Sequence, residues 1–268
     1  AQTAEPAAQE HEMAGNEIVV TAQHREELLQ EVPIAITAFD ADTLQNMRVT
    51  NALDLNNVAP GLRISSGDAA ANPKIFIRGV GLSDFNPSSS GAVSIYVDGV
   101  LYGSPLSQLS GFFDVGRVEV LRGPQGTLYG RNTTGGAINV ITNRPTQEWE
   151  ASASIDYGSY DTLRLNAAVG GPIIQDVLAF RVAGQRVRDD GYTENRVTGN
   201  SLNNSDRWAL RGQLLFTPSS NVEVLAQASF FRTRGGARAA KSRPLFPGVP
   251  EAAGANGLCA PAYYYSGM

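Results

Sequence analysis

The C-terminal half of the chain alternates between apolar and polar positions with a period of two. The pattern recurs in five successive segments, each about ten residues long. The apolar positions are Trp149, Ala151, Ala153, Ile155 and Tyr157; Leu163, Leu165, Ala167 and Val169; Phe180 and Val182; Trp208, Leu210, Leu214 and Phe216; and Val222, Val224, Ala226, Ala228 and Phe230. Charged or polar residues such as Arg164, Arg181 and Arg211 occupy the intervening positions. Because successive side chains of a strand point to opposite faces, each segment predicts a β-strand with one apolar face.

The connections between these segments help to choose between two architectures. A soluble β-sandwich and a membrane β-barrel would both give this alternation. However, "GGPIIQDV" and "TPSSN" are short and turn-like, whereas residues 189–205 and those after 234 are long and polar. Aromatic residues also stand near the segment ends, at Trp149, Tyr157, Trp208 and Phe216. Short turns at one end, long loops at the other and aromatic girdles favour a membrane barrel over a sandwich.

Residues 28–144 follow a different pattern, in which short apolar stretches are separated by turn and helix signals. Strands are predicted at residues 32–39, 74–78, 117–121 and 137–142, and a hairpin at residues 93–103. Asp98 and Gly99 lie between the arms of the hairpin, which is a strong turn signal. Asp40 and Thr50 stand at helix N-cap positions, so a short helix should follow each of them. The sequence therefore predicts a small α+β unit.

The glycine-rich stretch at residues 122–145 poses the question of a phosphate-binding loop. Gly130 and Gly135 have the spacing of a Walker loop. The next residues are Gly136 and Ala137, so the lysine and the hydroxyl that bind phosphate and metal in such a loop are both missing. We therefore interpret the stretch as a turn-forming segment without a nucleotide.

The composition argues against several classes of function. A net charge of −5 does not suit a nucleic-acid binder. The single cysteine, Cys259, and the two histidines, His11 and His24, do not have the spacing of a zinc site. The sequence contains neither H-E-x-x-H nor G-x-S-x-G, and it has no apolar run long enough for a membrane-spanning helix. We expect no metal, no cofactor and no enzymatic activity.

The N-terminal residues suggest export. "AQTAEPAAQE" resembles a mature end just after signal-peptide cleavage, and residues 1–16 have nothing to bury. "EIVVTAQHRE" follows as a short β-prone stretch without an apolar partner beside it. Such a stretch is either an ordinary edge strand or a peptide offered to the sheet of another protein.

Four motifs, in this order along the chain, carry a resemblance to a known family. They are "EIVVTA" (17–22), "IRGVG" (77–81), "VSIYVDGV" (93–100) and "VEVLRGPQGTLYGRNTTGGAINVITNRP" (118–145). Together with the period-two segments that follow, they resemble the N-terminal part of a TonB-dependent outer-membrane receptor. The similarity extends over roughly residues 17–233, and the longest motif is highly specific.

The resemblance implies an architecture of three parts in the Gram-negative outer membrane. Residues 1–27 would be a flexible arm with a TonB box, residues 28–145 an α+β plug domain, and residues 146–268 the first strands and loops of an antiparallel transmembrane β-barrel. Barrels of this family have 22 strands, so about five of them would be present here. Five strands leave open edges in lipid. We therefore expect a fragment that does not transport by itself.

The resemblance also implies roles for individual residues. The TonB box would be Glu17, Ile18, Val19, Val20, Thr21 and Ala22. Contacts between plug and barrel would involve Arg78, Glu119 and Arg122, although solvated turn arginines are the alternative for Arg78 and Arg122. Ligand-binding candidates lie in the polar segments 66–73 and 82–91: Asp68, Asn72, Ser83, Asp84, Phe85 and Asn86.

The function implied is active import of a scarce ligand. A ferric siderophore is the commonest substrate of the family, and cobalamin, haem and oligosaccharides are others. The implied partners are the periplasmic C-terminal domain of TonB, which would pair with the box as an added strand, the outer-membrane lipid and the imported ligand. The alternative is a secreted β-rich binding module or adhesin.

Overall fold

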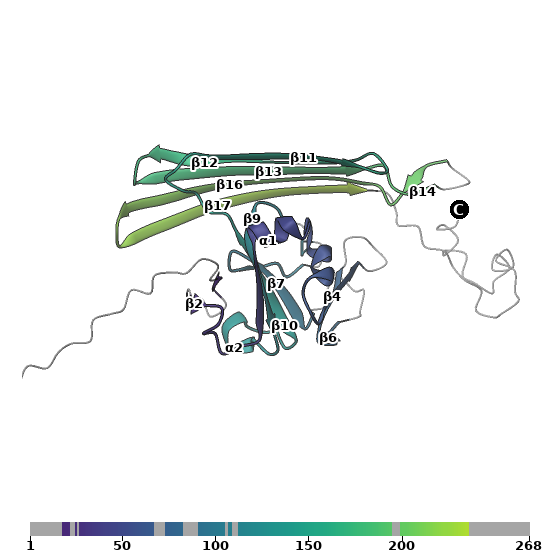
Figure 1. The fold of residues 1–268 in the computed structure, drawn as a ribbon, viewed down its shortest axis with the longest axis horizontal. Helices are drawn as coiled ribbons and strands as arrows, with labels where there is room; N and C mark the ends of the chain where they lie inside the picture. Colours follow the sequence, from purple (N-terminus) through teal and green to yellow (C-terminus); the bar gives the residue numbers. More distant parts are fainter. Residues whose placement is uncertain are drawn as a thin grey trace, which may run out of the picture.

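The computed structural model describes residues 18–21, 25, 27–66, 73–82, 91–104, 107–108, 112–194 and 199–235. Figure 1 shows two parts: a small mixed α+β unit, which we call the N-terminal unit, and a sheet of long strands that lies along one side of it. We call the second part the long-strand sheet. Within the part of the chain that the structure describes, no helix combines the length and the apolar character needed to span a bilayer.

The N-terminal unit is built on a five-stranded sheet with the order β3-β9-β10-β7-β8. Its strands are β3 (Ile36–Asp40), β7 (Val93–Val97), β8 (Val100–Leu101), β9 (Val115–Arg122) and β10 (Gly136–Thr142). Only β10 and β7 pair in parallel. The predicted strands are present, except that β3 begins at Ile36 rather than at residue 32. A smaller sheet contains β4 (Leu62–Ser66), β5 (Pro73–Ile77) and β6 (Val80–Gly81).

Two short helices follow β3, as predicted. The helix α1 (Ala41–Asn46) is capped by Asp40, whose side chain accepts a hydrogen bond from the backbone N–H of Thr43. The second element, η1 (Ala52–Asn57), is a 3-10 helix. Its cap is Asn51 rather than the predicted Thr50, so the predicted start is wrong by one residue.

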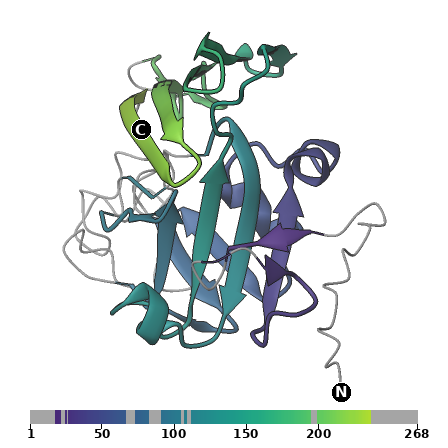
Figure 2. The same ribbon diagram turned by 90° about the vertical axis from the view of Figure 1, so that its left-hand side faces the viewer.

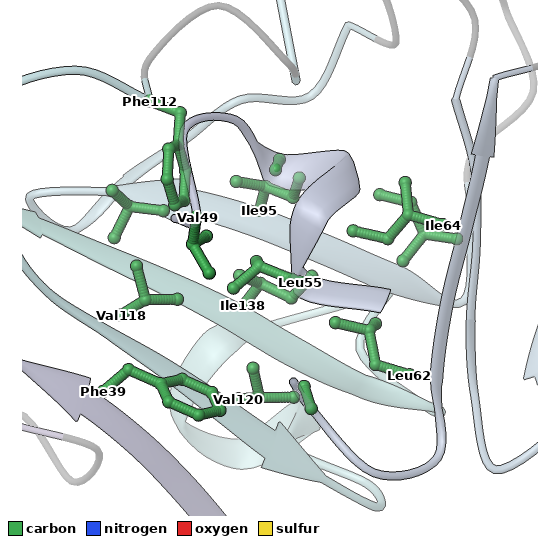
Figure 3. Close-up of a cluster of buried hydrophobic side chains, with 14 of the residues drawn as sticks. Phe39, Val49, Leu55, Leu62, Ile64, Ile95, Phe112, Val118, Val120 and Ile138 are labelled. Atoms are coloured by element: carbon green, nitrogen blue, oxygen red, sulfur yellow. The ribbon is translucent and has the colours of Figure 1, made fainter. Parts of the chain in front are cut away.

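The main core lies between one face of the five-stranded sheet and the segment that contains η1 (Figure 3). Leu55 of η1 and Ile138 of β10 have no exposed surface, and Val118 and Val120 of β9 are equally enclosed. Fully burying one such side chain contributes roughly 1.5–3 kcal/mol. This cluster therefore gives the N-terminal unit a core of its own.

The glycine-rich stretch makes the return from β9 to β10. A four-residue helix, α2 (Gly126–Tyr129), lies within it, and Gly130 ends that helix with a φ of 74°. Gly136 has a φ of 145°, and a Cβ there would lie 2.2 Å from the backbone oxygen of Leu121. These positions need glycine because the chain turns tightly against its own backbone.

The long-strand sheet is an antiparallel meander. Its strands are β11 (Glu150–Gly158), β12 (Thr162–Ile174), β13 (Leu178–Asp189), β16 (Ser205–Ser219) and β17 (Val222–Gly235). The long connection between β13 and β16 carries a small hairpin, β14 (Thr193–Glu194) and β15 (Ser201–Leu202). All five predicted segments are strands, so this prediction is confirmed.

The two faces of the long-strand sheet differ in the sense that the pattern predicted. On the face turned away from the N-terminal unit, Ile155 is 74% exposed, Phe230 57% and Val182 47%. On the opposite face, Arg211 and Gln213 are only 1% and 3% exposed. A water-soluble sandwich would bury the apolar face and expose the charged one. This sheet does the reverse, as expected for strands that face lipid.

Candidate functional site

The described part of the N-terminal arm is a short strand docked on the second face of the five-stranded sheet. Strand β1 (Val19–Val20) pairs antiparallel with β2 (Glu27–Leu28) through two residue pairs. Val20 has no exposed surface and belongs to a cluster with Leu121 and Tyr129. One apolar anchor and a very short ladder thus hold the strand in place.

A buried carboxylate completes the attachment of this strand. Glu119 Oε1 accepts hydrogen bonds from the backbone N–H of Thr21 at 2.7 Å and from its hydroxyl at 3.3 Å. Arg117 Nε lies 2.9 Å from the same oxygen, and Asn139 Nδ2 donates to Oε2 at 3.2 Å. The Glu119 side chain has no exposed surface. Its charge is therefore stabilised by donors that converge from β9, β10 and the N-terminal arm.

This position differs from the one expected for Glu119. The sequence interpretation placed it at the wall of a barrel, whereas its carboxylate lies inside the N-terminal unit and contacts Thr21. In β9 the apolar neighbours Val118 and Val120 face the main core, so Glu119 must face the side on which β1 docks. The sequence signal was a single carboxylate within an apolar strand, but its partner is 98 residues away in sequence.

The N-terminal unit is joined to the long-strand sheet by a buried ion pair. Asp114 immediately precedes β9, and its two carboxylate oxygens accept from Arg181 Nε at 2.8 Å and from Arg181 Nη2 at 2.7 Å. Arg181 Nη1 also donates to Glu150 at 3.0 Å. The side chains of Arg181 and Asp114 are 8% and 7% exposed. This bidentate geometry fixes the end of β9 against β13 and β11.

A second arginine of the long-strand sheet, Arg211, packs against Phe113, the residue that precedes Asp114. Arg211 Nη1 donates to the backbone oxygen of Phe113 at 3.0 Å, and its guanidinium lies 4.3 Å from the centre of the Phe113 ring. Phe231 contacts the same ring edge-on, with 6.0 Å between centroids. Gln213 donates to Thr142 at 3.2 Å. The polar face of the sheet is thus complementary to the N-terminal unit. Sequence analysis identified the charged face but not the residues that it meets.

A family match explains this arrangement of a compact unit against a sheet with a lipid-facing side. The family model of the TonB-dependent receptor plug domain matches residues 28–137. The chain belongs to the TonB-dependent outer-membrane receptors. The N-terminal unit is accordingly the plug, the long-strand sheet is part of the barrel, and the receptor resides in the Gram-negative outer membrane.

Known proteins similar to this receptor are receptors and transporters rather than enzymes. The pesticin receptor of Yersinia pestis is 36% identical over 168 residues, which are 62% of this chain and 24% of that protein. The crystal structure of the ferric yersiniabactin uptake receptor from Yersinia pestis matches 75% of this chain and 32% of its own, with a TM-score of 0.70 and 33% identity. A vitamin B12 transporter of Vibrio vulnificus is 35% identical over 147 residues, 53% of this chain and 23% of that protein. The chain thus spans between about a quarter and a third of the length of these relatives.

The two arginines expected at the barrel wall do not contact the described strands of the sheet. Arg78 lies in an exposed turn with a φ of 51°. Arg122 Nε donates to the backbone oxygen of Pro60 at 3.1 Å, and its guanidinium also contacts the Thr37 hydroxyl. Burial lowers the pKa of Arg122, and the nearby positive charge of Arg78 lowers that pKa further. A carboxylate from elsewhere would relieve this repulsion, so the wall contact stays a prediction.

The remaining predicted residues cannot be placed. Glu17 and Ala22 of the box and all six ligand-binding candidates, Asp68, Asn72, Ser83, Asp84, Phe85 and Asn86, lie outside the described residues. Within the described ranges, no group of three or more His, Cys, Asp and Glu residues could hold a metal ion. A cavity of about 810 Å³ does lie between α1 and the long-strand sheet, and it is lined by Asp114, Asp156 and Arg164 among others. Its polar lining suits water or a polar solute in the space between plug and wall.

Proposed function

We propose that the receptor imports a ferric siderophore and that TonB drives this import by pairing with residues 17–22. Two relatives support an iron-chelate substrate: one is named for ferric yersiniabactin uptake, and the other is the ferripyoverdine receptor of Pseudomonas aeruginosa, at 30% identity. The vitamin B12 transporter makes cobalamin the second candidate. The boundaries of the arm at residues 1–27, of the plug at 28–145 and of the barrel portion at 146–268 belong to the same proposal.

The attachment of β1 is the observation that carries the proposed TonB coupling. Strand addition requires free backbone N–H and C=O groups on the strand that is offered. Here β2 occupies one edge of β1, and Glu119 binds the N–H of Thr21. A two-residue ladder is marginal by itself. The ladder itself is therefore weak, and a longer ladder with TonB has to replace mainly the burial of Val20 and the hydrogen bonds of Thr21 to Glu119.

The proposal is tested by Val19→Pro in the full-length receptor expressed in cells. Proline removes a backbone donor and cannot take part in a continuous ladder. We expect surface binding of ferric yersiniabactin to be retained and its accumulation in the cell to fall to the level of a strain without TonB. The matched control is Val19→Ile, which keeps the N–H and should keep accumulation.

Two outcomes would contradict parts of the proposal. Accumulation by Val19→Pro at the wild-type rate would overturn the TonB coupling. Accumulation of labelled cobalamin, but of no ferric siderophore in an iron-limited growth panel, would overturn the substrate and leave the coupling intact.

A further inference from the structure

The lipid-facing side of the sheet carries a compact group of arginines at one end. Arg186 and Arg188 lie on β13, and Arg232 and Arg234 lie on β17. They occupy the same alternate positions as the exposed apolar residues Val182 and Phe230, so their side chains project outward from the lipid-facing side of the sheet. We call these four residues the arginine cluster.

The strand register brings the arginine cluster into two adjacent rows. Strand β16 lies between β13 and β17, and Trp208 pairs with both Arg186 and Arg232. In the next row, Asp206 pairs with both Arg188 and Arg234. Strand spacing places the arginines of one row about 10 Å apart, and two residues along a strand separate the rows by about 7 Å. The backbone positions of the four arginines therefore lie within an area of about 10 Å by 7 Å.

The arginine cluster has more positive charge than its surroundings neutralise. Asp206 lies 3.8 Å from Arg186, and Asp190 lies 3.5 Å from Arg188. The Arg186 guanidinium also stacks on the Trp208 ring at 4.4 Å. Among the residues that the structure describes, Arg232 and Arg234 form no ion pair, and both are exposed. Counted by the ion pairs among the described residues, four guanidinium groups against two carboxylates leave an excess of two positive charges.

The cluster lies at the boundary of the apolar band. Along β13, the outward positions are Leu178, Phe180, Val182 and Gly184, none of which is polar, and Arg186 is the next outward position. Eight residues separate Leu178 from Arg186, which is roughly 27 Å along a strand, close to the ~25 Å height of the apolar band of an outer-membrane barrel. Arginines at this height are near the lipid head groups, where a charged side chain on the lipid face destabilises the barrel little.

The position of the N-terminal strand identifies the leaflet. Figure 1 shows β2 toward the end of the sheet at which β12 ends, and Figure 2 shows this end facing the viewer. The short turns at residues 175–177 and 220–221 are at that end. In outer-membrane barrels the short turns face the periplasm. A strand that is offered to TonB must also face the periplasm, so the two observations agree. The arginine cluster is at the opposite end, with the β14–β15 connection, and therefore meets the outer leaflet.

A separate apolar groove lies on the same face, nearer the centre of the band. It has a volume of about 510 Å³ and is lined by Phe180, Val182, Leu214 and the small residues Gly212, Ala226 and Ala228, among others. Val182 is four residues from Arg186 on the same face of β13, which is about 14 Å. An acyl chain attached to a head group at the cluster would reach this groove.

We propose that the arginine cluster and the groove form one binding site for a phosphorylated glycolipid of the outer leaflet. Arginine binds phosphate oxygens bidentately, and Trp208 supplies an amphipathic ring at the interface. The groove accommodates part of one acyl chain. A free phosphate ion would satisfy the arginines but would leave the groove without a ligand, so the site takes a lipid.

The test uses the full-length receptor extracted from outer membranes in a mild detergent, with lipopolysaccharide as the probe. The variant Arg232→Gln/Arg234→Gln removes the two arginines without ion pairs, and we expect it to bind lipopolysaccharide about tenfold or more weakly. The matched control is Arg63→Gln/Arg131→Gln, which removes two exposed arginines of the plug and should not change binding. The heat-dependent shift in gel mobility reports that each variant is folded.

A second variant tests the groove separately. A Cβ at Gly212 would meet no atom within 4 Å, so Gly212→Leu starts its side chain in open space and places it in the groove. It should weaken binding of lipopolysaccharide several-fold, whereas Ala151→Leu on the outer face of β11 should not. Unchanged binding in both test variants would overturn the proposal. So would displacement of lipopolysaccharide by millimolar inorganic phosphate, or co-purification of a stoichiometric protein on this face in place of lipid.

Discussion

The plug and the long-strand sheet bury opposite kinds of side chain. In the plug, Leu55, Ile77 and Ile138 have no exposed surface. In the long-strand sheet the buried side chains include Arg211 and Gln213, whereas those of Phe230 and Val182 are exposed. The plug is arranged for water outside and an apolar core inside, whereas the sheet has lipid outside and a polar partner inside. The same residue types therefore stabilise the two parts by different contacts.

The largest effect is expected where the two parts meet. Arg181→Ala would leave the carboxylate of Asp114 buried without its bidentate partner, which typically costs about 3–5 kcal/mol. Chemical denaturation of the extracted protein should show this loss. Arg144→Ala is the matched control, because Arg144 also pairs plug with sheet, through Glu223, but both side chains are about half exposed. That pair should contribute at most about 1 kcal/mol. Equal effects of the two variants would contradict the role given to the buried pair.

The plug core should respond like that of a water-soluble domain. Leu55→Ala removes a fully buried side chain from η1 and should cost about 2–5 kcal/mol. Phe230→Ala on the lipid face opens no enclosed cavity, so its cost should be smaller although more atoms are removed. Protease susceptibility of the plug and denaturant midpoints measure both variants. A larger loss for Phe230→Ala would show that this face packs against protein.

Charged substitutions at two exposed valines test whether each one faces lipid or water. Val182 lies four residues from either end of the apolar band, and Val100 is 62% exposed on β8 of the plug. Val182→Arg should cost roughly 2–4 kcal/mol in lipid vesicles, since a charge at the bilayer midplane is costly. Val100→Arg should stay within about 0.5 kcal/mol of the wild type. If Val182→Arg were equally harmless, the outer face of the sheet would not be in lipid.

The smallest effect is expected at the cap of α1. Asp40→Ala removes the hydrogen bond to the Thr43 backbone and should cost about 1 kcal/mol. Hydrogen bonds from Thr43 lower the pKa of Asp40 below 3.8. The carboxylate therefore stabilises the folded state above the unfolded-state pKa and loses this contribution as pH falls through the lowered value. Hydrogen exchange of α1 should differ between variant and wild type at neutral pH, and the difference should shrink below pH 4. A constant difference would contradict the charged cap.

Local patterns predicted the strands and helices well because local physics determines them. Alternation over residues 148–230 predicted five strands and the face of each, since the pleat imposes the period. Asp40 predicted the start of α1, whereas Thr50 was one residue early because Asn51 caps η1. The helix α2 was not predicted, as the glycines around it favour turns.

The site was harder to predict because its contacts join distant parts of the chain. Glu119 and Thr21 are 98 residues apart, and Asp114 and Arg181 are 67 residues apart. No local pattern specifies which charged residue meets which. The resemblance supplied the box, and Ile18, Val19, Val20 and Thr21 do lie in or beside a docked strand. The wall contacts of Arg78 and Arg122 stay predictions.

Strand β9 has a mechanical consequence. Glu119 in the middle of the strand binds the N-terminal arm, and Asp114 just before the strand binds Arg181 of the wall. Tension on the arm would therefore enter β9 and travel about 17 Å of covalent backbone to reach the wall. Along that route the arm is held by a two-residue ladder, Val20 and Glu119, and the wall by the bidentate pair of Asp114 and Arg181, so we expect a pull to free the arm first and to leave the rest of the plug seated.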